Sequence, residues 1–425
     1  MMDVEEDYVG PLGGADRYLR YSKGTATKPG LPLPTVGNIK LILQHDPRWA
    51  GRLWRNVFTD MNMITTDGHH RTIEPADVLD CWDFLQVHYG MDPSKDRISD
   101  AIDLTATRKG VSRDPLVNEL LRCHYRWEEQ GKPKGIHSWL FDYLGVAPVV
   151  RDEDYTKSLS AVGSKFLISL IARALRPGSK VDNVLILEGA QGSGKSTAFS
   201  ILGGEYFSDS SIDIRSKDAY QSLPGVWIHE FAELDSMRKR ESTAIKAFLS
   251  SKQDRYRPSY GRSMVEVKRR TVFVGTTNEG SFLTDSTGNR RFWPVKTGKI
   301  RLDELKRQRD YLLGEAVQAF RDGQPWHLTA DEDRQFSDMR SSYLQTHPWA
   351  ELIADFVRGS TPEWARWRAL EFITTQDILM HCLEMPKDRW TKSDKSQIGD
   401  VMSLLGWQES RQRVDGRQLR GWTRP

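Results

Sequence analysis

Along the N-terminal part of the chain, apolar residues recur with a helical period. This periodicity predicts helices over residues 74–88 and 94–107, preceded by short extended pieces around Asp67-Gly68. We therefore expect residues 36–135 to form a mostly helical domain. Residues 1–35 keep no apolar period and are punctuated by glycine and proline, which is typical of a flexible segment.

The pattern then changes to strands that alternate with helices. A helix expected over residues 158–175 ends at Pro177-Gly178, where proline and glycine stop the helical pattern. Short apolar runs typical of buried strands follow at residues 184–187, 226–228 and 271–274. Helical patterns separate these runs, and this alternation favours an α/β fold with a parallel sheet over residues 136–335.

The C-terminal residues 345–425 are expected to form a small separate domain, after a linker around residues 331–348. Thr374-Thr375 predicts the start of a helix, and a second helix is expected over residues 395–405. Residues 411–422 read as an arginine-rich pair of strands. Helix-turn-helix followed by a basic strand pair is typical of a winged helix that touches DNA phosphates; an oligomer contact or capping module is the alternative.

Composition narrows the class of protein. Charged residues make up 28% and hydrophobic residues 38%, an ordinary globular balance. Lys and Arg total 61 against 58 Asp and Glu, so a nucleic-acid surface must be local. The three cysteines (Cys81, Cys123 and Cys382) lack the spacing of a disulfide framework or a zinc site. No uninterrupted apolar run of membrane length and no signal-peptide core is found, so we expect a soluble, cytoplasmic protein without a membrane partner.

A glycine-rich segment carries the clearest chemical signal. Residues 189–196 fit G-x-x-x-x-G-K-[ST], and an expected strand precedes them while a helix follows. Such a loop cradles phosphates with backbone N–H groups, Lys195 would hold the β- and γ-phosphates of ATP, and Ser196 would bind Mg²⁺. The ATP-binding candidates are Gly189, Gln191, Gly192, Ser193, Gly194, Lys195, Ser196 and Thr197. The alternative is a glycine-rich turn with a solvated lysine.

Two glutamates at the end of the second expected strand are candidates to complete this site. Glu230 is the first candidate to hold Mg²⁺ together with Ser196, because such enzymes need a carboxylate on a neighbouring strand. Glu233 lies three residues further on, and the roles of metal ligand and catalytic base stay open between the two. The alternative is a strand cap and a solvated glutamate. His229 should point to the opposite face and has no expected catalytic role.

Polar and basic residues follow the third expected strand. Asn278 at its tip is a candidate to orient the water that attacks the γ-phosphate, with a simple turn as the alternative. Arg290 and Arg291 are candidates to stabilise the charge that spreads in phosphoryl transfer, and such an arginine can come from a neighbouring subunit. The alternative for either arginine is pairing with surface carboxylates.

A basic hairpin is expected between residues 254 and 270. Arginines interleaved with tyrosines suit contacts to phosphates and stacking on single-stranded bases. The DNA-binding candidates are Arg255, Arg257, Tyr260, Arg262, Lys268, Arg269 and Arg270. A solvated surface hairpin, or salt bridges between subunits, is the alternative.

Through these motifs the sequence resembles the virulence-associated E family of phage and prophage replication proteins. The resemblance is dense over residues 136–330. Its motifs are LEGAQGSGKST (187–197), GVWIHEFAEL (225–234), IKAFLSSKQDRYRPSYGR (245–262), VFVGTTN (272–278) and DSTGNRRFWPV (285–295). That family is similar to superfamily 3 helicases, an AAA+-like branch of ring-forming ATPases. The resemblance implies a P-loop at 189–196, the acidic strand end at Glu230, a DNA-contacting hairpin near 255–270, a sensor at Asn278 and an arginine finger at Arg290 or Arg291.

The sequence also departs from this family in two places. Related chains often carry a primase-polymerase domain, but the N-terminal ~130 residues are short and helical and lack an acidic metal triad. Phe231 follows Glu230, where such helicases commonly have an adjacent acidic pair, and this leaves the catalytic base open.

These features together predict a P-loop ATPase of the AAA+/superfamily 3 type, with a helical N-terminal domain and a winged-helix-like C-terminal domain. The expected function is an ATP- and Mg²⁺-dependent DNA helicase of phage or prophage replication, a homo-oligomer, expected as a hexamer, that translocates on single-stranded DNA in the bacterial cytoplasm. It would contact single- and double-stranded DNA and work with a separate primase. The alternative is an ATP-switched replication initiator or loader with little unwinding; a weaker one is a DNA-packaging or defence ATPase.

Overall fold

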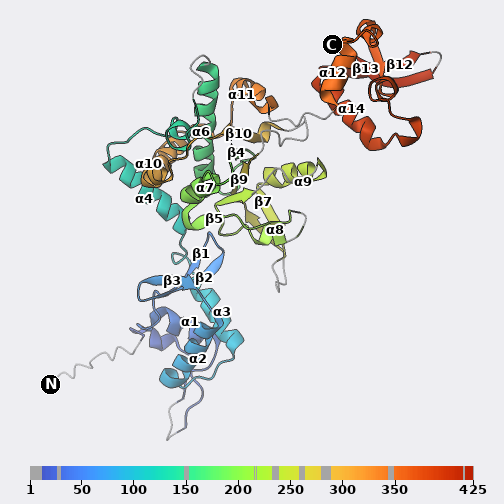
Figure 1. Ribbon diagram of the computed structural model, residues 1–425. Helices are drawn as coiled ribbons and strands as arrows, with labels where there is room; N and C mark the ends of the chain where they lie inside the picture. The colour runs from blue at the N-terminus through green and yellow to red at the C-terminus, as the bar shows by residue number, and fades with distance from the viewer. Residues whose placement is uncertain are drawn as a thin grey trace, which may run out of the picture. The chain divides into compact units, whose positions relative to one another are not determined.

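The computed structural model describes residues 12–25, 30–147, 153–214, 216, 218–231, 239–257, 264–278, 289–342, 349–414 and 417–424. The chain divides into two compact units, Met1–Arg122 with Leu223–Val226 and Cys123–Ser222 with Trp227–Pro425. Figure 1 labels many of the helices and strands of both units. The division falls inside helix α4 (Pro115–Glu129), N-terminal to the expected boundary at residue 135.

The first unit combines helices with a small antiparallel sheet. Its elements include α1 (Val36–His45), β1 (Leu53–Asn56), β2 (Met61–Thr66), β3 (His69–Thr72), α2 (Pro75–Tyr89) and α3 (Lys95–Ala106). The strands lie in the order β1-β2-β3, and the turn between β2 and β3 has left-handed backbone at Asp67 (φ 52°) and Gly68 (φ 80°). Ile39, Ile42, Leu85 and Ile98 are among the residues of its core. The helices predicted over 74–88 and 94–107 are therefore confirmed.

A buried carboxylate closes the end of α1. Asp46 accepts hydrogen bonds from the Arg48 side chain at 2.9 and 2.7 Å and from the Tyr89 hydroxyl at 2.8 Å. Burial by itself raises the pKa of this carboxyl. The hydrogen bonds from Arg48 and Tyr89 outweigh it and lower the pKa of Asp46 from 3.8 to about 2. The ionised carboxylate is thus part of the folded state of the first unit.

We expect this unit to lose stability as the pH falls from about 4 to about 2, because the unfolded carboxyl binds a proton more readily than the folded one there. The pKa difference corresponds to on the order of 2 kcal/mol of unfolding free energy. Asp46→Asn should lower the stability at pH 7 and flatten the profile below pH 4. Urea unfolding followed by tryptophan fluorescence checks this, and a variant with the wild-type profile would contradict it.

The second unit is built on a five-stranded parallel sheet. Its strands are β4 (Val184–Glu188), β5 (Phe207–Ser208), β6 (Ile228–Phe231), β9 (Val272–Thr277) and β10 (Phe292–Lys296), in the spatial order β10-β4-β9-β6-β5. All four pairs of neighbours are parallel. The expected parallel α/β sheet is therefore confirmed. No pattern predicts β5, because two residues are too few to show a period.

The unit also contains helices, several of which pack on this sheet (Figure 1). They are α5 (Trp139–Leu144), α6 (Glu153–Leu175), α7 (Lys195–Gly203), α8 (Asp218–Gln221), α9 (Lys239–Ser250), α10 (Leu302–Arg321) and α11 (Ala330–Ser342). By length and composition α6 could cross a membrane, but 83% of its apolar window is buried inside the structure, so this is weak evidence for a span. Both α10 and α11 contact α6.

The prediction of a linker around residues 331–348 is wrong for residues 331–342, because these residues belong to helix α11. Phe336 in this helix is fully buried. The sequence of α11 is mostly polar, with Phe336 and Met339 as its only large apolar residues, and this is too short a pattern to establish a helical period.

The segment after α9 forms an antiparallel hairpin of β7 (Gln253–Tyr256) and β8 (Val265–Lys268). Its register pairs Arg255 with Glu266 and Asp254 with Val267. The predicted strand pair is thus present. Residues 258–263, which include the candidates Tyr260 and Arg262, lie outside the described residues.

The C-terminal region has its own core and its own sheet. Its elements include α12 (Ala350–Arg358), β11 (Phe372–Thr374), α13 (Thr375–Asp377), α14 (Lys392–Leu404), β12 (Gln408–Val414) and β13 (Arg417–Thr423). The antiparallel strands lie in the order β11-β13-β12. The helix start predicted at Thr374 is confirmed, because its side chain accepts a hydrogen bond from the Asp377 backbone N–H in a capping box. Ile373, Ile398 and Trp422 belong to the core.

Candidate functional site

The glycine-rich loop lies between strand β4 and helix α7. Gly192 and Gly194 have φ angles of +74° and +92°, a left-handed backbone that residues with a side chain rarely adopt. Helix α7 begins at Lys195, so the N-terminal end of the helix faces the loop. Helix N-termini and nests of backbone N–H groups attract anions. The strand before the loop and the helix after it are therefore present as the sequence predicted.

Lys195 connects this loop to the end of the central strand β9. Its ammonium group donates hydrogen bonds to the carbonyl oxygens of Gly189 (2.7 Å) and Ala190 (3.0 Å) and to Oδ1 of Asn278 (3.0 Å). The lysine is buried, while Asn278 is exposed just after β9. Two candidates that come from separate motifs are thus in direct contact.

Glu230 lies on β6, the strand on the other side of β9 from β4. Its Oε1 accepts hydrogen bonds from the hydroxyls of Ser196 (2.8 Å) and Thr276 (2.6 Å). The side chain is buried, and its Oε2 has no hydrogen-bond partner among the described residues. A buried carboxylate oxygen without a donor is costly unless something else contacts it.

These atoms could hold a divalent cation. Carboxylate and hydroxyl oxygens are the ligands that Mg²⁺ prefers, and Mg²⁺ is typically held by one or two protein groups together with substrate phosphates. The unsatisfied Oε2 of Glu230 fits such a role, with Ser196 beside it. Glu233, the second candidate for this position, lies outside the described residues.

The order of the strands explains why these residues meet. Strand β9 lies between β4 and β6, so the loop after β4, the end of β9 and Glu230 on β6 share one edge of the sheet. In open parallel sheets, ligands bind outside the carboxyl ends of the strands. The sequence motifs did not identify Thr276. Its place at the polar end of an otherwise apolar strand is the feature that could have indicated it.

His229 is buried on β6 beside Glu230. Its ring packs edge-on against Phe231 at 5.3 Å and Phe273 at 6.0 Å between ring centroids. Burial lowers the pKa of His229 from 6.5 to about 4, so the ring is neutral at pH 7. The ring thus packs among aromatic side chains of β6 and β9, and its expected lack of a catalytic role stays a prediction.

The two candidate arginines differ in their surroundings. Both belong to the turn Asn289–Arg291 that leads into β10. Arg290 is exposed. Arg291 is half-buried; its Nε donates to Oγ of Ser250 at 3.1 Å and lies 3.7 Å from a carboxylate oxygen of Asp182. Arg291 is therefore bound within its own unit, whereas Arg290 faces solvent.

The candidate DNA-binding residues divide into exposed and buried ones. Arg255, Arg257 and Lys268 are exposed on the hairpin. The assignment of Arg269 to DNA is wrong, because its side chain is fully buried and forms an ion pair with Asp254. A guanidinium in that position cannot reach a phosphate in solvent.

Arg270 is half-buried next to this pair. Its guanidinium donates a hydrogen bond to the carbonyl oxygen of Ala174 at 2.9 Å. Ala174 belongs to α6. This contact makes Arg270 a weaker candidate for DNA than the three exposed residues.

Comparisons with known proteins agree with the sequence motifs. The model of the virulence-associated protein E-like domain matches residues 121–345. Among solved structures, an apo structure of the NrS-1 C terminal region is similar, with 12% identity, 87% of this chain and 95% of that chain covered, and a TM-score of 0.46. Another form of the same region gives 10% identity, the same coverage and a TM-score of 0.45. A search of curated sequences returned no match.

Proposed function

This chain belongs to the virulence-associated protein E-like family, and from that premise we propose that it is an ATP-driven motor of phage or prophage DNA replication. In this proposal it hydrolyses ATP in an AAA+-like P-loop core and translocates on single-stranded DNA as a helicase. The observation that carries the proposal is the convergence of Lys195, Ser196, Glu230 and Asn278 at one edge of the parallel sheet.

Each of these residues has a chemical role in the proposed reaction. The amides of loop 189–197 and the Lys195 ammonium bind and orient the phosphates of ATP. Ser196 and Glu230 would hold Mg²⁺, which when bound neutralises charge on the phosphate oxygens. Thr276 fixes the Glu230 carboxylate through its hydrogen bond to Oε1. Asn278 orients the attacking water, and the catalytic base is Glu230 or Glu233.

The nucleotide site would be completed by a second copy of the chain. An arginine supplied across a subunit boundary stabilises the charge that develops in phosphoryl transfer. The exposure of Arg290 supports it for this role, whereas Arg291 is bound to Ser250 and Asp182. We propose a ring, with a hexamer as the expected size, in which the hairpins β7–β8 contact the strand. A separate primase would supply primers.

Arg290→Ala should lower ATP hydrolysis by about a thousandfold while leaving ATP binding intact, because the arginine acts on the neighbour's γ-phosphate. Mixing Arg290→Ala with Lys195→Ala subunits should restore part of the activity. Interfaces then form in which one subunit supplies an intact loop and the next supplies Arg290. Steady-state hydrolysis of the mixture checks this, and two variants that stay inactive together would contradict a shared site.

The function itself is tested by hydrolysis and strand displacement. Purified protein should hydrolyse ATP with Mg²⁺, faster with a single-stranded oligonucleotide, and should displace a labelled strand from a forked duplex. Mass measurement with and without ATP and oligonucleotide should give a ring in their presence. Absence of hydrolysis in all these conditions would refute the motor.

A second candidate function is an ATP-switched initiator or loader, and the C-terminal region favours it. Its sheet order β11-β13-β12 with helices α12 to α14 supports a winged helix, and Arg411 and Arg413 are exposed on β12. Winged helices bind duplex DNA. ATP-dependent binding to duplex DNA without strand displacement would support the initiator over the helicase.

A further inference from the structure

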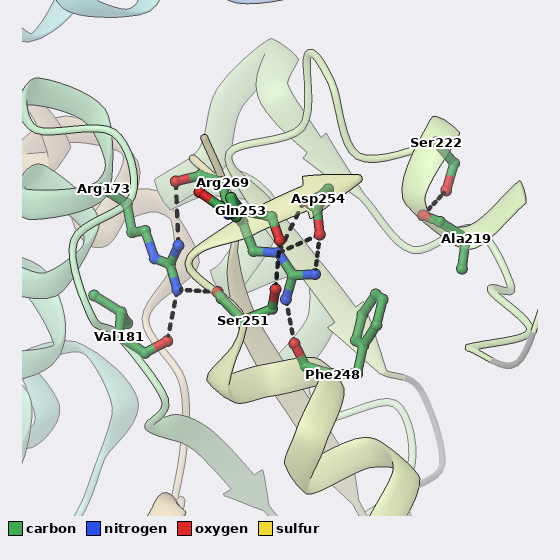
Figure 2. A network of polar contacts seen from close by, with 9 residues as sticks. All are labelled: Arg173, Val181, Ala219, Ser222, Phe248, Ser251, Gln253, Asp254 and Arg269. Carbon is green, nitrogen blue, oxygen red and sulfur yellow. Dashed lines mark hydrogen bonds and ion pairs between the residues drawn. The ribbon is translucent and has the colours of Figure 1, made fainter. Parts of the chain in front are cut away.

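Three arginine side chains from distant parts of the chain converge on the C-terminal end of α9. Arg269 donates to the carbonyl oxygen of Phe248, Arg173 donates to that of Ser251 at 3.2 Å, and Arg291 donates to Oγ of Ser250 at 3.1 Å. Figure 2 shows the first two of these contacts. Carbonyl groups at a helix C-terminus lack partners within the helix and carry partial negative charge, so they attract guanidinium groups.

Arg269 fixes the base of the hairpin β7–β8. It lies directly between β8 and the central strand β9, and its Nε is 3.0–3.1 Å from both carboxylate oxygens of Asp254 on β7. Both side chains are buried. The hairpin base is thus tied to β9 covalently through β8, and by the Asp254–Arg269 ion pair through β7.

Arg173 on α6 completes a junction that Asp254, Arg269 and Arg173 form at the base of the hairpin. Its guanidinium donates to the carbonyl oxygens of Arg269 at 3.1 Å and of Val181 at 2.9 Å (Figure 2). Burial, and then the charge of Arg269, lower the pKa of Arg173 to about 10, so it stays charged at pH 7. Helix α6, the segment before β4 and the hairpin base are therefore joined by one side chain.

The junction also touches the strands of the nucleotide site. The Arg269 guanidinium lies over the rings of Phe248 at 4.5 Å and Phe273 at 5.5 Å. Phe273 precedes Thr276 on β9 and stacks on Phe231, the residue after Glu230, at 5.3 Å. A displacement of the hairpin base would therefore be transmitted to both strands that hold the Glu230 contacts.

Stability alone does not explain such a buried pair. Removing two charges from water is costly, and replacing a buried ion pair by apolar residues is often neutral or stabilising. A directional pair at a junction instead fixes the relative position of the elements it joins. The elements here are the exposed basic hairpin, the end of α9, and the turn with Arg290, which Arg291 ties to Ser250.

We propose that Asp254, Arg269 and Arg173 are positioning residues that hold the hairpin and the Arg290 turn as one body, so that DNA on the hairpin accelerates hydrolysis at the adjoining subunit. This inference rests on the proposed function. It replaces a direct DNA contact by Arg269 with an indirect role, in which the side chain acts through the end of α9 and through β9.

The test is the double variant Asp254→Leu with Arg269→Met, which replaces the ion pair by apolar groups of similar size. Hydrolysis without DNA and the half-saturating ATP concentration should stay near wild type. The maximal stimulation by saturating single-stranded oligonucleotide should fall about tenfold. A variant with the wild-type thermal unfolding midpoint and full stimulation would overturn the proposal. If the double variant does not fold, Asp254→Asn keeps the shape of the side chain and should lose part of the stimulation; full stimulation there would equally overturn it.

Arg255→Ala is the matched control, because Arg255 is exposed on the same strand as Asp254. It should raise the oligonucleotide concentration needed for half-maximal stimulation while the maximum is retained. The double variant should instead lower the maximal stimulation and leave the half-saturating oligonucleotide concentration near that of wild type. Wild-type protein without any hydrolysis would refute the proposed function, whereas stimulated wild type with an equally stimulated double variant would overturn this inference alone.

Discussion

Lys195→Ala should reduce ATP hydrolysis by a factor of about a thousand or more. Its ammonium already lies among oxygens of the loop and of Asn278, at 2.7 to 3.0 Å. In the proposed reaction it stays beside the β- and γ-phosphates as their charge redistributes. Alanine removes one of the cations that offset this charge, inside a buried site where such interactions are strongest.

The measurement is steady-state hydrolysis with and without a single-stranded oligonucleotide, together with DNA binding, which should persist. Lys180→Ala is the matched control, because Lys180 is exposed in the same unit and should leave hydrolysis unchanged. Wild-type strand displacement by the Lys195→Ala variant would contradict the assignment of the loop as the motor site.

Glu230→Gln should lower hydrolysis by about a hundredfold and raise the Mg²⁺ concentration that half-saturates the protein. Glutamine keeps an oxygen that can accept from Ser196 and Thr276 but removes the negative charge from the buried Oε2 position. Binding of a fluorescent ATP analogue during a Mg²⁺ titration reports on the metal separately from turnover.

Thr276 supplies the matched pair of variants for this experiment. Thr276→Val removes the hydroxyl that donates to Glu230 Oε1 and should cost about tenfold in hydrolysis, while Thr276→Ser keeps the hydroxyl and should stay near wild type. Unchanged Mg²⁺ dependence in Glu230→Gln would exclude Glu230 as a metal ligand and leave Glu233 as the candidate.

Much of the site was predictable because its residues lie at the ends of strands. Lys195 and Ser196 follow from the spacing of the glycines, and Glu230 and Asn278 follow from apolar runs that end in polar residues. The contact between Lys195 and Asn278 depends on β9 lying next to β4, and local sequence does not encode the order of strands. Thr276 could not be chosen over its neighbours for the same reason.

The assignment of Arg269 failed for a different physical reason. It stands in a run of three basic residues, Lys268 to Arg270, which normally indicates an exposed surface. Its partner Asp254 is fifteen residues earlier, and only the register of the hairpin brings the two together. The sequence likewise gave no reason to prefer Arg290 or Arg291 as the arginine supplied to a neighbouring subunit. The hydrogen bond from Arg291 to Ser250 distinguishes the two, because it holds Arg291 within its own unit.

The placement of β4 affects how a nascent chain can mature. This strand is the first of its sheet to leave the ribosome, yet both of its neighbours, β9 and β10, are synthesised about a hundred residues later. Until residue 296 has emerged, the apolar faces of β4 lack their partners, and pairing of such distant segments is slow. Prematurely terminated chains would therefore carry the complete glycine-rich motif without the strand that places Asn278 beside it, and they would offer an aggregation-prone strand to chaperones.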